Sequence, residues 1–391
     1  MRAVMYGAGN IGRGFIGLLL SQSGYEVSFV DVNDTVISAM NEAHRYPVDI
    51  LVEDGIREEW AENISCVDGK NPEAVAAAIA GADVMATAVG VNILKFIAAP
   101  IAGGLKKRWA EGNMTPFNII ICENLIGADK VLHDLIAENM DASEVENLNA
   151  LVGFVEASIG RMVPVQTPEM QKGNPLRVCV EAYDRLPLDK AAVKGEYPPI
   201  KNVIWYTPFE FYIERKLFIH NMGHAMTAYL GDLLGCEYIW QAIENPTVEL
   251  MVIRAMTASA IALAKRHGGD TADLYAHVQD LIRRFANRGL GDTVKRVGGD
   301  IRRKLSPGDR LVGALKMCKE QGVDSIYIEA AIAAALCFKH DDVLNEKSAE
   351  EILREVSQLS DTTRILAIYA QLKKGESLEN VLWSLKQEAD R

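Results

Sequence analysis

Residues 1–12 read Met1-Arg2-Ala3-Val4-Met5-Tyr6-Gly7-Ala8-Gly9-Asn10-Ile11-Gly12, a short apolar run that leads straight into the pattern G-x-G-x-x-G. A helical pattern of apolar residues follows, so the segment predicts a strand, a glycine-rich turn and a helix. In a dinucleotide-binding unit Gly7 permits the tight turn, Gly9 lets the backbone approach a pyrophosphate, and Gly12 lets the helix pack closely on the strand. The diphosphate would lie on the free N–H groups at the start of the helix, where the helix dipole favours anions.

A second apolar run, Val27-Ser28-Phe29-Val30, ends at Asp31, close to the distance expected beyond the last glycine. A carboxylate in this position accepts hydrogen bonds from the ribose 2′-hydroxyl and repels a 2′-phosphate, which favours NAD over NADP. The alternative is a glycine-rich turn in a Rossmann-like domain that has lost its cofactor. The sequence therefore predicts an NAD site formed by Gly7, Ala8, Gly9, Asn10, Ile11, Gly12 and Asp31.

Strand and helix patterns alternate to about residue 155, which is typical of a parallel, doubly wound sheet. The expected strands are Val84–Val89, Phe117–Cys122 and Leu151–Val155, and the expected helices between them include Pro72–Ala80 and Leu125–Asn139. Strand-like pieces at Arg177–Ala182 and Asn202–Tyr206 predict an extension of this sheet. The later segments are helical in pattern: Phe209–Leu233, Thr247–Arg266, Thr271–Phe285, Asp324–Phe338 and Ala349–Leu372. The prediction is an α/β fold, with a Rossmann-type doubly wound sheet and its β extension over residues 1–206 and an all-α domain over residues 207–391.

The composition of the 391 residues argues against several classes of function. A net charge of −12 makes a nucleic-acid or acidic-membrane surface unexpected. The six cysteines show no CxxC pairing and are expected to be reduced, as in a cytosolic protein. The chain begins directly with a strand and its apolar runs are too short to span a bilayer, so neither a signal peptide nor a membrane helix is expected. The expectation is a cytoplasmic protein that acts on a small molecule as a monomer or weak homo-oligomer.

The segment from Lys216 to His224 contains a lysine, an asparagine and a histidine with the spacing K-x4-N-x2-H. On an α-helix, at about 100° per residue, Asn221 would lie roughly 140° from Lys216, and His224 roughly 80° from it. The three side chains would point into one broad sector, where they could take a proton from an alcohol, stabilise the oxyanion and hold a neighbouring hydroxyl. Together with the dinucleotide signature, this set predicts a hydride-transfer enzyme.

Lys216 is the expected general base. A lysine with an ordinary pKa of about 10.4 would be protonated at neutral pH, but burial and a nearby positive nicotinamide would lower its pKa towards neutrality. The alternative is a solvated lysine paired with Glu214 or Glu123. A metal site at His220 and His224 is not expected, because the glutamate of HExxH is missing and no third ligand is evident.

Five blocks of the sequence, Gly7–Gly17, Cys122–Asn124, Glu214–Phe218, Gly223–Gly231 and Arg303–Leu311, closely resemble the mannitol dehydrogenase family of polyol-specific long-chain dehydrogenases. The K-x4-N-x2-H spacing is specific to this family, and the longer blocks favour the branch that acts on sugar phosphates. The resemblance implies NAD-dependent interconversion of mannitol 1-phosphate and fructose 6-phosphate, with a lysine base and no metal. It also implies that the amides of Asn124 and Asn221 form an oxyanion hole and that His224 binds a substrate hydroxyl.

Several of these roles have structural alternatives. Asn124 precedes a helical pattern that begins at Leu125 and could be the N-cap of that helix. His224 could be a hydrogen-bonded structural histidine, and Glu123 could either tune the charge of Lys216 or be a structural carboxylate.

A basic stretch near residue 300 is the expected phosphate site, with Arg303, Lys304 and Arg310 as its candidate ligands. Neighbouring aspartates could neutralise part of this charge instead. The chain departs from the family pattern at Gly299, where an arginine is usual, and at Gly160, where an aspartate is usual. Two alternatives therefore stay open: a sibling enzyme acting on a free polyol, fructuronate or tagaturonate, and a nucleotide-binding protein without turnover.

Overall fold

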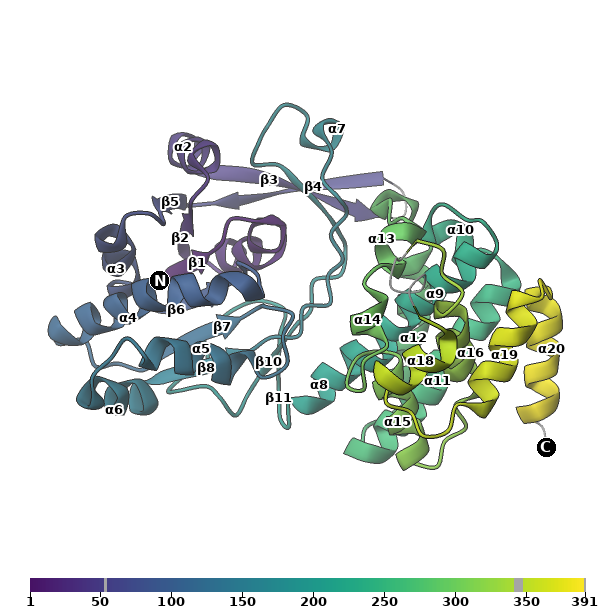
Figure 1. Cartoon of the computed structure of the whole chain (residues 1–391). Coiled ribbons are helices and arrows are strands. Elements are labelled where there is room, and N and C mark those ends of the chain that lie inside the picture. Colours follow the sequence, from purple (N-terminus) through teal and green to yellow (C-terminus); the bar gives the residue numbers. More distant parts are fainter. Residues whose placement is uncertain (53–54, 341–346, 390–391) are drawn as a thin grey trace. The chain divides into compact units, whose positions relative to one another are not determined.

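The computed structural model describes residues 1–52, 55–340 and 347–389. The chain forms two compact units, unit 1 over Met1–Glu210 and unit 2 over Phe211–Arg391 (Figure 1). Unit 1 is built around β-sheet and unit 2 around helices. The sequence placed the boundary between residues 206 and 207, four residues before the observed one.

Unit 1 contains a six-stranded sheet in which every neighbouring pair of strands is parallel. The strand order is β5-β2-β1-β6-β7-β8. The strands are β1 (Arg2–Tyr6), β2 (Glu26–Asp31), β5 (Ile64–Asp68), β6 (Val84–Thr87), β7 (Phe117–Ile121) and β8 (Val152–Glu156). The order runs outward from β1 in both directions, so the point where it reverses lies between β1 and β6. Open α/β sheets bind their ligands outside the carboxyl ends of the strands at this switch point.

The strands of the sheet carry apolar side chains on each face, and helices cover both faces and bury these side chains. In β1, Ala3 and Met5 belong to one buried cluster, and Val4 and Tyr6 belong to the other. The first cluster includes residues of η1 (Gly12–Gly17), α1 (Leu18–Gln22) and α2 (Asp34–Ala43). The second includes residues of α3 (Pro72–Ala80), α4 (Leu94–Ala110), α5 (Ala128–Ala137) and α6 (Ala142–Leu151). A short 3-10 turn, η2 (Val91–Ile93), joins β6 to α4.

Two smaller sheets complete unit 1. One has the order β4-β3-β9, from β4 (Gly55–Glu62), β3 (Arg45–Val52) and β9 (Val178–Glu181), and the other pairs β10 (Leu186–Asp189) with β11 (Val203–Tyr206). The strands predicted near 177–182 and 202–206 are therefore present, but they pair in sheets of their own and do not lengthen the main sheet. The β3–β4 pair was not predicted; β4 is largely exposed and gives little hydrophobic signal. A one-turn helix, α7 (Pro168–Gln171), precedes β9.

The regular elements of unit 2 among its described residues are helices, joined by loops and by one isolated β-bridge between Tyr238 and Thr293. Its elements are α8 (Glu210–Glu214, whose first residue closes unit 1), η3 (Arg215–Asn221), α9 (Met222–Leu233), α10 (Ile239–Ile243), α11 (Pro246–His267), α12 (Thr271–Phe285), η4 (Arg288–Leu290), α13 (Val294–Gly298), α14 (Ile301–Lys304), α15 (Val312–Glu320), α16 (Ile326–Ala335), α18 (Ala349–Glu355), α19 (Thr363–Lys373) and α20 (Leu378–Ala389). The single helix predicted over Ala349–Leu372 is wrong, because it is broken between α18 and α19. Asp361 lies in this break and accepts a hydrogen bond from the N–H of Thr363 at 3.2 Å, a local bond that competes with helix formation.

The central helix of unit 2 is α11, which packs against η3, α9, α12, α15 and α16. Its start is fixed by Asn245, whose side chain accepts hydrogen bonds from the N–H groups of Thr247 and Val248, and its end by Gly268 in the left-handed conformation. Among the described helices, α11 alone is long and apolar enough to cross a membrane. More than half of its most apolar stretch is buried inside the unit, as in the core helix of a globular domain.

The helices α3 and α4 pack closely enough to test the fold with two adjacent glycines. A Cβ atom on Gly104 would lie 2.6 Å from the Cβ atom of Ile79, whereas a Cβ atom on Gly103 would meet nothing within 4 Å. We expect Gly104→Ala to lower the free energy of unfolding by about 1–3 kcal/mol, because the backbones of α3 and α4 must separate. Urea-induced unfolding measures this change.

Gly103→Ala is the matched control in the same helix. It should raise the free energy of unfolding by about 0.5–1 kcal/mol, because alanine loses less backbone entropy than glycine on folding. Equal effects of the two substitutions would contradict the close packing of α3 on α4.

Candidate functional site

The glycine-rich turn after β1 lies at the switch point of the sheet. Gly7 has a φ of +101°, and a Cβ atom there would lie 2.7 Å from the carbonyl oxygen of Ala88, the residue after β6. A Cβ atom on Gly12 would collide with the carbonyl oxygen of Gly7. Gly7 and Gly12 are therefore required by the backbone itself. A Cβ atom on Gly9, in contrast, would meet nothing within 4 Å, so the space above this residue is open.

This open space fits the pyrophosphate of a dinucleotide. Gly9 and Asn10 are exposed at the start of the helical segment that continues through η1, and the N–H groups of a first helical turn lack partners within the helix. The helix dipole adds partial positive charge at the same place. The turn from Gly7 to Gly12 thus leaves an open space beside the free N–H groups of the helix start, an arrangement that favours an anion.

Asp31 ends β2 beside this turn. Its Oδ2 accepts a hydrogen bond from the N–H of Ala8 at 2.7 Å, and its Oδ1 accepts from Val32 at 2.8 Å and from Asn33 at 3.0 Å. The carboxylate therefore joins the glycine turn to the end of β2. The sequence predicted its position, but it did not predict this bond to the turn.

Arg161 is buried against the helical segment that follows the turn. Its Nη1 donates to the carbonyl oxygen of Gly14 at 2.9 Å, and its guanidinium lies 4.9 Å from the ring centre of Phe15. Burial lowers the pKa of Arg161 to about 10. Gly160 precedes it, and a Cβ atom there would lie 3.0 Å from the ring of Tyr183. Gly160 thus lies against an aromatic ring.

Glu123 and Asn124 follow β7 at the carboxyl edge of the sheet. Glu123 is buried, and its two carboxylate oxygens accept hydrogen bonds from the hydroxyl of Thr87 at 2.6 Å and from the N–H of Val89 at 3.0 Å. These contacts are those of a structural carboxylate that joins the ends of β6 and β7. Asn124 is exposed. It is not a helix N-cap, because α5 begins at Ala128 and has Gly127 as its N-cap.

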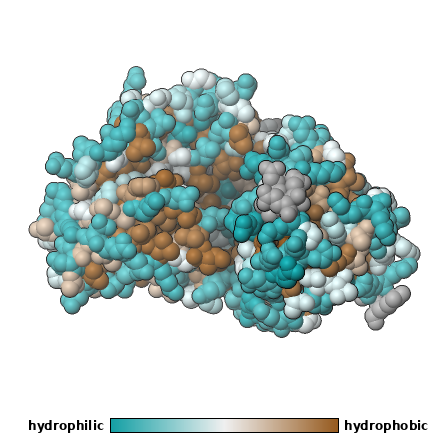
Figure 2. Space-filling view, in the orientation of Figure 1, coloured by the Kyte–Doolittle hydropathy of each residue, from teal (hydrophilic) through white to brown (hydrophobic). Residues whose placement is uncertain are grey.

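Exposed apolar residues lie beyond the carboxyl ends of β6 and β7. Val91 and Ile93 follow β6, and Ile126 follows β7. Figure 2 shows hydrophobic surface on the face of unit 1 in view, between hydrophilic areas. Apolar side chains at the ligand edge of the sheet provide a surface that suits the flat rings of a dinucleotide.

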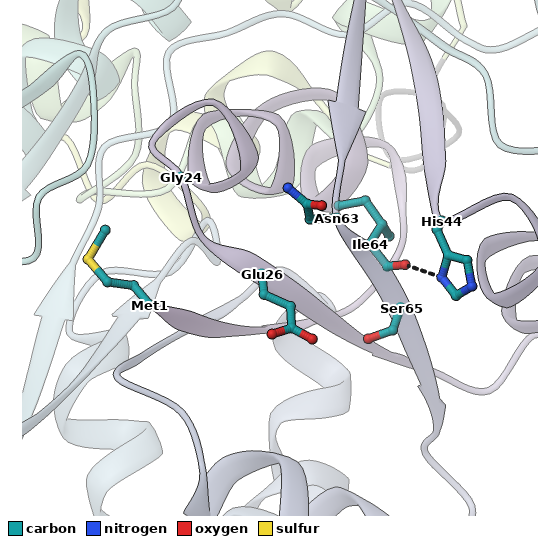
Figure 3. A pocket seen from close by; sticks show the side chains of 7 residues that line it. All are labelled: Met1, Gly24, Glu26, His44, Asn63, Ile64 and Ser65. Carbon is teal, nitrogen blue, oxygen red and sulfur yellow. Dashed lines mark hydrogen bonds between the residues drawn. The ribbon is translucent and has the colours of Figure 1, made fainter.

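A pocket of about 490 Å³ lies at the other edge of the sheet (Figure 3). It is lined by Met1, Gly24, Glu26, His44, Asn63, Ile64 and Ser65. Glu26 and Ile64 are the first residues of β2 and β5, so the pocket lies at the amino ends of the strands. It is not the dinucleotide site, because ligands of open α/β sheets bind at the carboxyl ends.

In unit 2 the three residues of the K-x4-N-x2-H motif are all half-buried. Lys216 and Asn221 lie in the π-helical segment η3, and His224 lies in the first turn of α9. The prediction of an α-helix for Lys216–Asn221 is therefore wrong. In a π-helix the backbone bonds join residues five apart, so one turn takes about one residue more than an α-helical turn. Side chains five positions apart then lie on the same face, which brings Lys216 and Asn221 closer together than an α-helix would.

Glu214, two residues before Lys216, is one of the two acidic residues that the sequence offers as its partner. Glu214 binds Arg266 at 2.6 Å through one carboxylate oxygen and His267 at 2.8 Å through the other. Both oxygens of Glu214 are thus engaged by Arg266 and His267.

His224 is held from two sides. Its Nε2 lies 3.4 Å from Oδ2 of Asp292, and its ring stacks on Phe285 with centroids 4.9 Å apart and an interplanar angle of 14°. Burial by itself would raise the pKa of the Asp292 carboxyl, but the hydrogen bond to His224 and an ion pair with Arg296 lower it below its ordinary value. Asp292 therefore stays ionised and orients the imidazole.

His220 has a different environment from His224. It is buried, and burial, followed by the positive charge of Arg284, lowers its pKa well below the ordinary value. The ring is therefore neutral and packs near Phe285, with centroids 5.9 Å apart. Among the described residues no group of three or more His, Cys, Asp or Glu side chains could hold a metal ion.

The candidate phosphate ligands are partly occupied within unit 2. Arg303 forms ion pairs with Asp300 and Asp309, and Nε of Arg310 binds Asp309 at 2.7 Å. Lys304 is buried, and its ammonium donates to the carbonyl oxygens of Val297, at 2.9 Å, and Gly299. Burial lowers the pKa of Lys304 to about 8.

These contacts do not neutralise the segment. Residues 295–310 contain six lysines and arginines and two aspartates, which leaves an excess of four positive charges. Among them, Lys295 and Arg302 are exposed.

The sequence did not predict the two residues that hold His224, Asp292 and Phe285. From the sequence, Asp292 is one of the aspartates that could neutralise the basic stretch, and Phe285 is the last residue of a predicted helix. The single local signal was the spacing of Asp292 and Arg296, four residues apart on α13 and the turn before it. Nothing local connects either residue with His224, which lies more than sixty positions earlier.

Residues 1–202 match the model of the mannitol dehydrogenase Rossmann domain, and residues 209–386 match that of the mannitol dehydrogenase C-terminal domain. The chain is 38% identical to a mannitol-1-phosphate 5-dehydrogenase from Brevibacillus brevis, over 91% of this chain and 90% of the relative. It is 37% identical to a mannitol-1-phosphate 5-dehydrogenase from Thermoanaerobacter pseudethanolicus, over 96% of this chain and 98% of the relative.

Two solved structures share the fold. A D-sorbitol dehydrogenase in substrate-free form superposes with a TM-score of 0.78 at 16% identity, covering 98% of this chain and 91% of that one. A Pseudomonas fluorescens mannitol 2-dehydrogenase, in a ternary complex with NAD and D-mannitol, superposes with a TM-score of 0.75 at 16% identity, covering 98% and 94%. Since two family models together span nearly the whole sequence, the chain belongs to the mannitol dehydrogenase family.

Proposed function

We propose that this protein is an NAD-dependent oxidoreductase that interconverts mannitol 1-phosphate and fructose 6-phosphate. The observation that carries the proposal is the set of Lys216, Asn221 and His224 in unit 2, in a chain whose first turn forms a dinucleotide cradle. The relatives at 34–39% identity over most of the chain bear the name mannitol-1-phosphate 5-dehydrogenase. A binding protein without turnover would have no use for a base, an amide donor and an oriented imidazole.

NAD would be held by the turn from Gly7 to Gly12 and by Asp31. The open space at Gly9 would take the pyrophosphate, and Asp31 would accept a bond from the ribose 2′-hydroxyl and repel a 2′-phosphate. When bound, the cofactor would accept a hydride from the secondary carbon of the sugar alcohol.

The residues of the chain would handle the proton and the oxygen. Lys216 would take the hydroxyl proton when the alcohol is oxidised and return it when the ketone is reduced. Asn221 in unit 2 and Asn124 in unit 1 are assigned as N–H donors to the substrate oxygen, and one such donor is typically worth about 3 kcal/mol. His224, oriented by Asp292, would bind the reacting hydroxyl or the one beside it. No metal is required for any of these steps.

The phosphate group is assigned to the positive segment that contains Arg303, Lys304 and Arg310. The excess of positive charge in this segment supports an anionic substrate. Lys304 itself has mainly a structural role, because its ammonium donates to two carbonyl groups. Exposed cations of the same segment, Lys295 and Arg302, are further candidates. A sibling activity on fructuronate or tagaturonate is the second candidate, because a carboxylate would suit the same segment. The protein is proposed to act in the cytoplasm on small molecules, as a monomer or weak homo-oligomer.

The substrate assignment is tested by NADH oxidation with fructose 6-phosphate, fructose and fructuronate in parallel, in the presence of a metal chelator. We expect turnover with fructose 6-phosphate and little with the other two, because the phosphate dianion brings more negative charge to the positive segment than the fructuronate carboxylate does, and fructose brings none. Inorganic phosphate should compete with fructose 6-phosphate. Turnover of fructose or fructuronate alone would assign the protein to a sibling activity, and loss of activity with the chelator would contradict a metal-free mechanism.

Lys216→Ala tests the general base. We expect kcat to fall by several orders of magnitude while the Kd for NADH changes little, because the cofactor residues lie in unit 1 and the base lies in unit 2. Stopped-flow turnover and NADH fluorescence titration measure the two quantities. Lys386→Ala, at a half-buried lysine of α20, is the control and should behave as the wild type. A Lys216→Ala variant with most of its activity would refute the lysine-base mechanism.

Asp31→Ala tests the choice of NAD over NADP. The substitution removes the acceptor for the ribose hydroxyl and the charge that repels a 2′-phosphate, so the ratio of kcat/KM for NADH to that for NADPH should fall by about tenfold or more. Asp34→Ala, at an exposed aspartate that pairs with Lys70, is the control and should keep the wild-type ratio. Since Asp31 also binds the N–H of Ala8, thermal unfolding of both variants separates a damaged turn from a changed preference. An unchanged ratio in a stable Asp31→Ala variant would show that Asp31 does not recognise the ribose 2′-hydroxyl.

A further inference from the structure

The segment that carries Lys216 and Asn221 departs from regular helix in a way that needs support. The π-helical segment η3 interrupts an otherwise α-helical run from α8 to α9. Single π turns inside α-helices are rare, and they occur often at functional sites. An α-helix is the more stable alternative for an isolated chain, so some contact outside the segment must stabilise the wider turn.

Ser259 of α11 provides such a contact. Its side chain is fully buried, and its hydroxyl donates a hydrogen bond of 2.7 Å to the carbonyl oxygen of Phe218, in the middle of η3. The two residues are 41 positions apart, so the bond is tertiary and not part of the local helix. A side chain that binds a helix carbonyl from outside competes with the regular i→i−4 ladder, and the insertion of such a bond is a recognised cause of irregular helix geometry.

The packing around Phe218 fixes the position of this carbonyl. A Cβ atom on Gly313 of α15 would collide with the ring of Phe218, and a Cβ atom on Gly223 of α9 would collide with the sulfur of Met256 on α11. Met256 lies one helical turn before Ser259. The helix α11 therefore contacts α9 at Met256 and, one turn later, η3 at Ser259. This packing fixes the position at which the Ser259 hydroxyl meets the carbonyl oxygen of Phe218.

We propose that Ser259 is a positioning residue for the reaction. Its hydroxyl stabilises the π turn, and the π turn places Lys216 and Asn221 on one face of the helix. In an α-helix the two side chains would diverge by roughly 140° around the axis. The inference rests on the proposed function of Lys216 and Asn221, and it adds a buried serine that touches neither substrate nor cofactor.

Three substitutions of Ser259 separate its hydrogen bond from its volume. Ser259→Ala removes the hydroxyl, Ser259→Cys keeps the volume with only a weak donor, and Ser259→Thr keeps the hydroxyl. The matched control is Thr227→Val, because Thr227 is also fully buried and its hydroxyl donates at 2.8 Å to the carbonyl of Gly223 within the α-helical part.

The first readout is kcat, measured with whichever substrate of the parallel assay the wild type turns over. We expect kcat to fall by about ten- to a hundredfold in Ser259→Ala and Ser259→Cys, since small misplacements of catalytic groups have effects of this size. Ser259→Thr should restore most of the activity, and the Kd for NADH should stay unchanged in all variants. Wild-type kcat in Ser259→Ala, or an equal loss in Thr227→Val, would overturn the proposal.

The second readout is amide hydrogen exchange of residues 215–222, which needs no substrate. Exchange should become faster in Ser259→Ala than in the wild type, because the π turn loses its outside support, and it should not change in Thr227→Val. A fall in kcat without faster exchange in this segment would also overturn the proposal.

The two readouts distinguish this inference from the proposed function. If the wild type reduces none of the sugars, the proposed function fails, while the exchange measurement still decides whether Ser259 supports the π turn. If the wild type is active and Ser259→Ala is equally active, the proposed function stands and the role of Ser259 fails.

Discussion

The close approach of the backbone at Gly7 and Gly12 is the constraint on which unit 1 depends. No side chain fits at either position, because the carbonyl oxygens of Ala88 and Gly7 occupy the space of a Cβ atom. The helix after β1 can therefore start directly above the switch point of the sheet, and its first N–H groups face an open space at Gly9. Asp31 fixes the same turn from the neighbouring strand through the N–H of Ala8. The open space for a diphosphate thus follows from one steric requirement at the turn.

Both segments that carry functional motifs contain π-helical turns, η1 in unit 1 and η3 in unit 2. A π turn has poorer intrinsic stability than an α-helical turn, so each must be held by its surroundings. In η1, Arg161 binds the carbonyl of Gly14, and in η3, Ser259 binds the carbonyl of Phe218. The two units use the same physical means: a distant side chain binds a carbonyl of an irregular helix, and small residues allow neighbouring elements to approach closely.

The buried ionisable groups near the two motifs differ in their partners, and these partners indicate the role of each group. Glu123 binds a hydroxyl and a backbone N–H, so its charge is satisfied inside unit 1. Asp292 remains ionised between His224 and Arg296, whereas burial and the positive charge of Arg284 keep His220 of η3 neutral. Because ionisable groups are stable in the interior only when their charge is compensated, these contacts distinguish an oriented histidine from a structural one.

The sequence by itself determined the family, the two-part organisation, the glycine turn with Asp31 and the motif from Lys216 to His224, because these depend on local order along the chain. A strand followed by G-x-G-x-x-G needs no distant residue to be recognised. Tertiary structure decided the rest. The π geometry of η3, the Asp292 partner of His224 and the contacts of Lys304 with two carbonyls depend on packing between residues far apart or on backbone geometry that periodicity does not show. Local propensity favours an α-helix for Lys216–Asn221, and only the contacts of α11 and α15 with Phe218 give it another form.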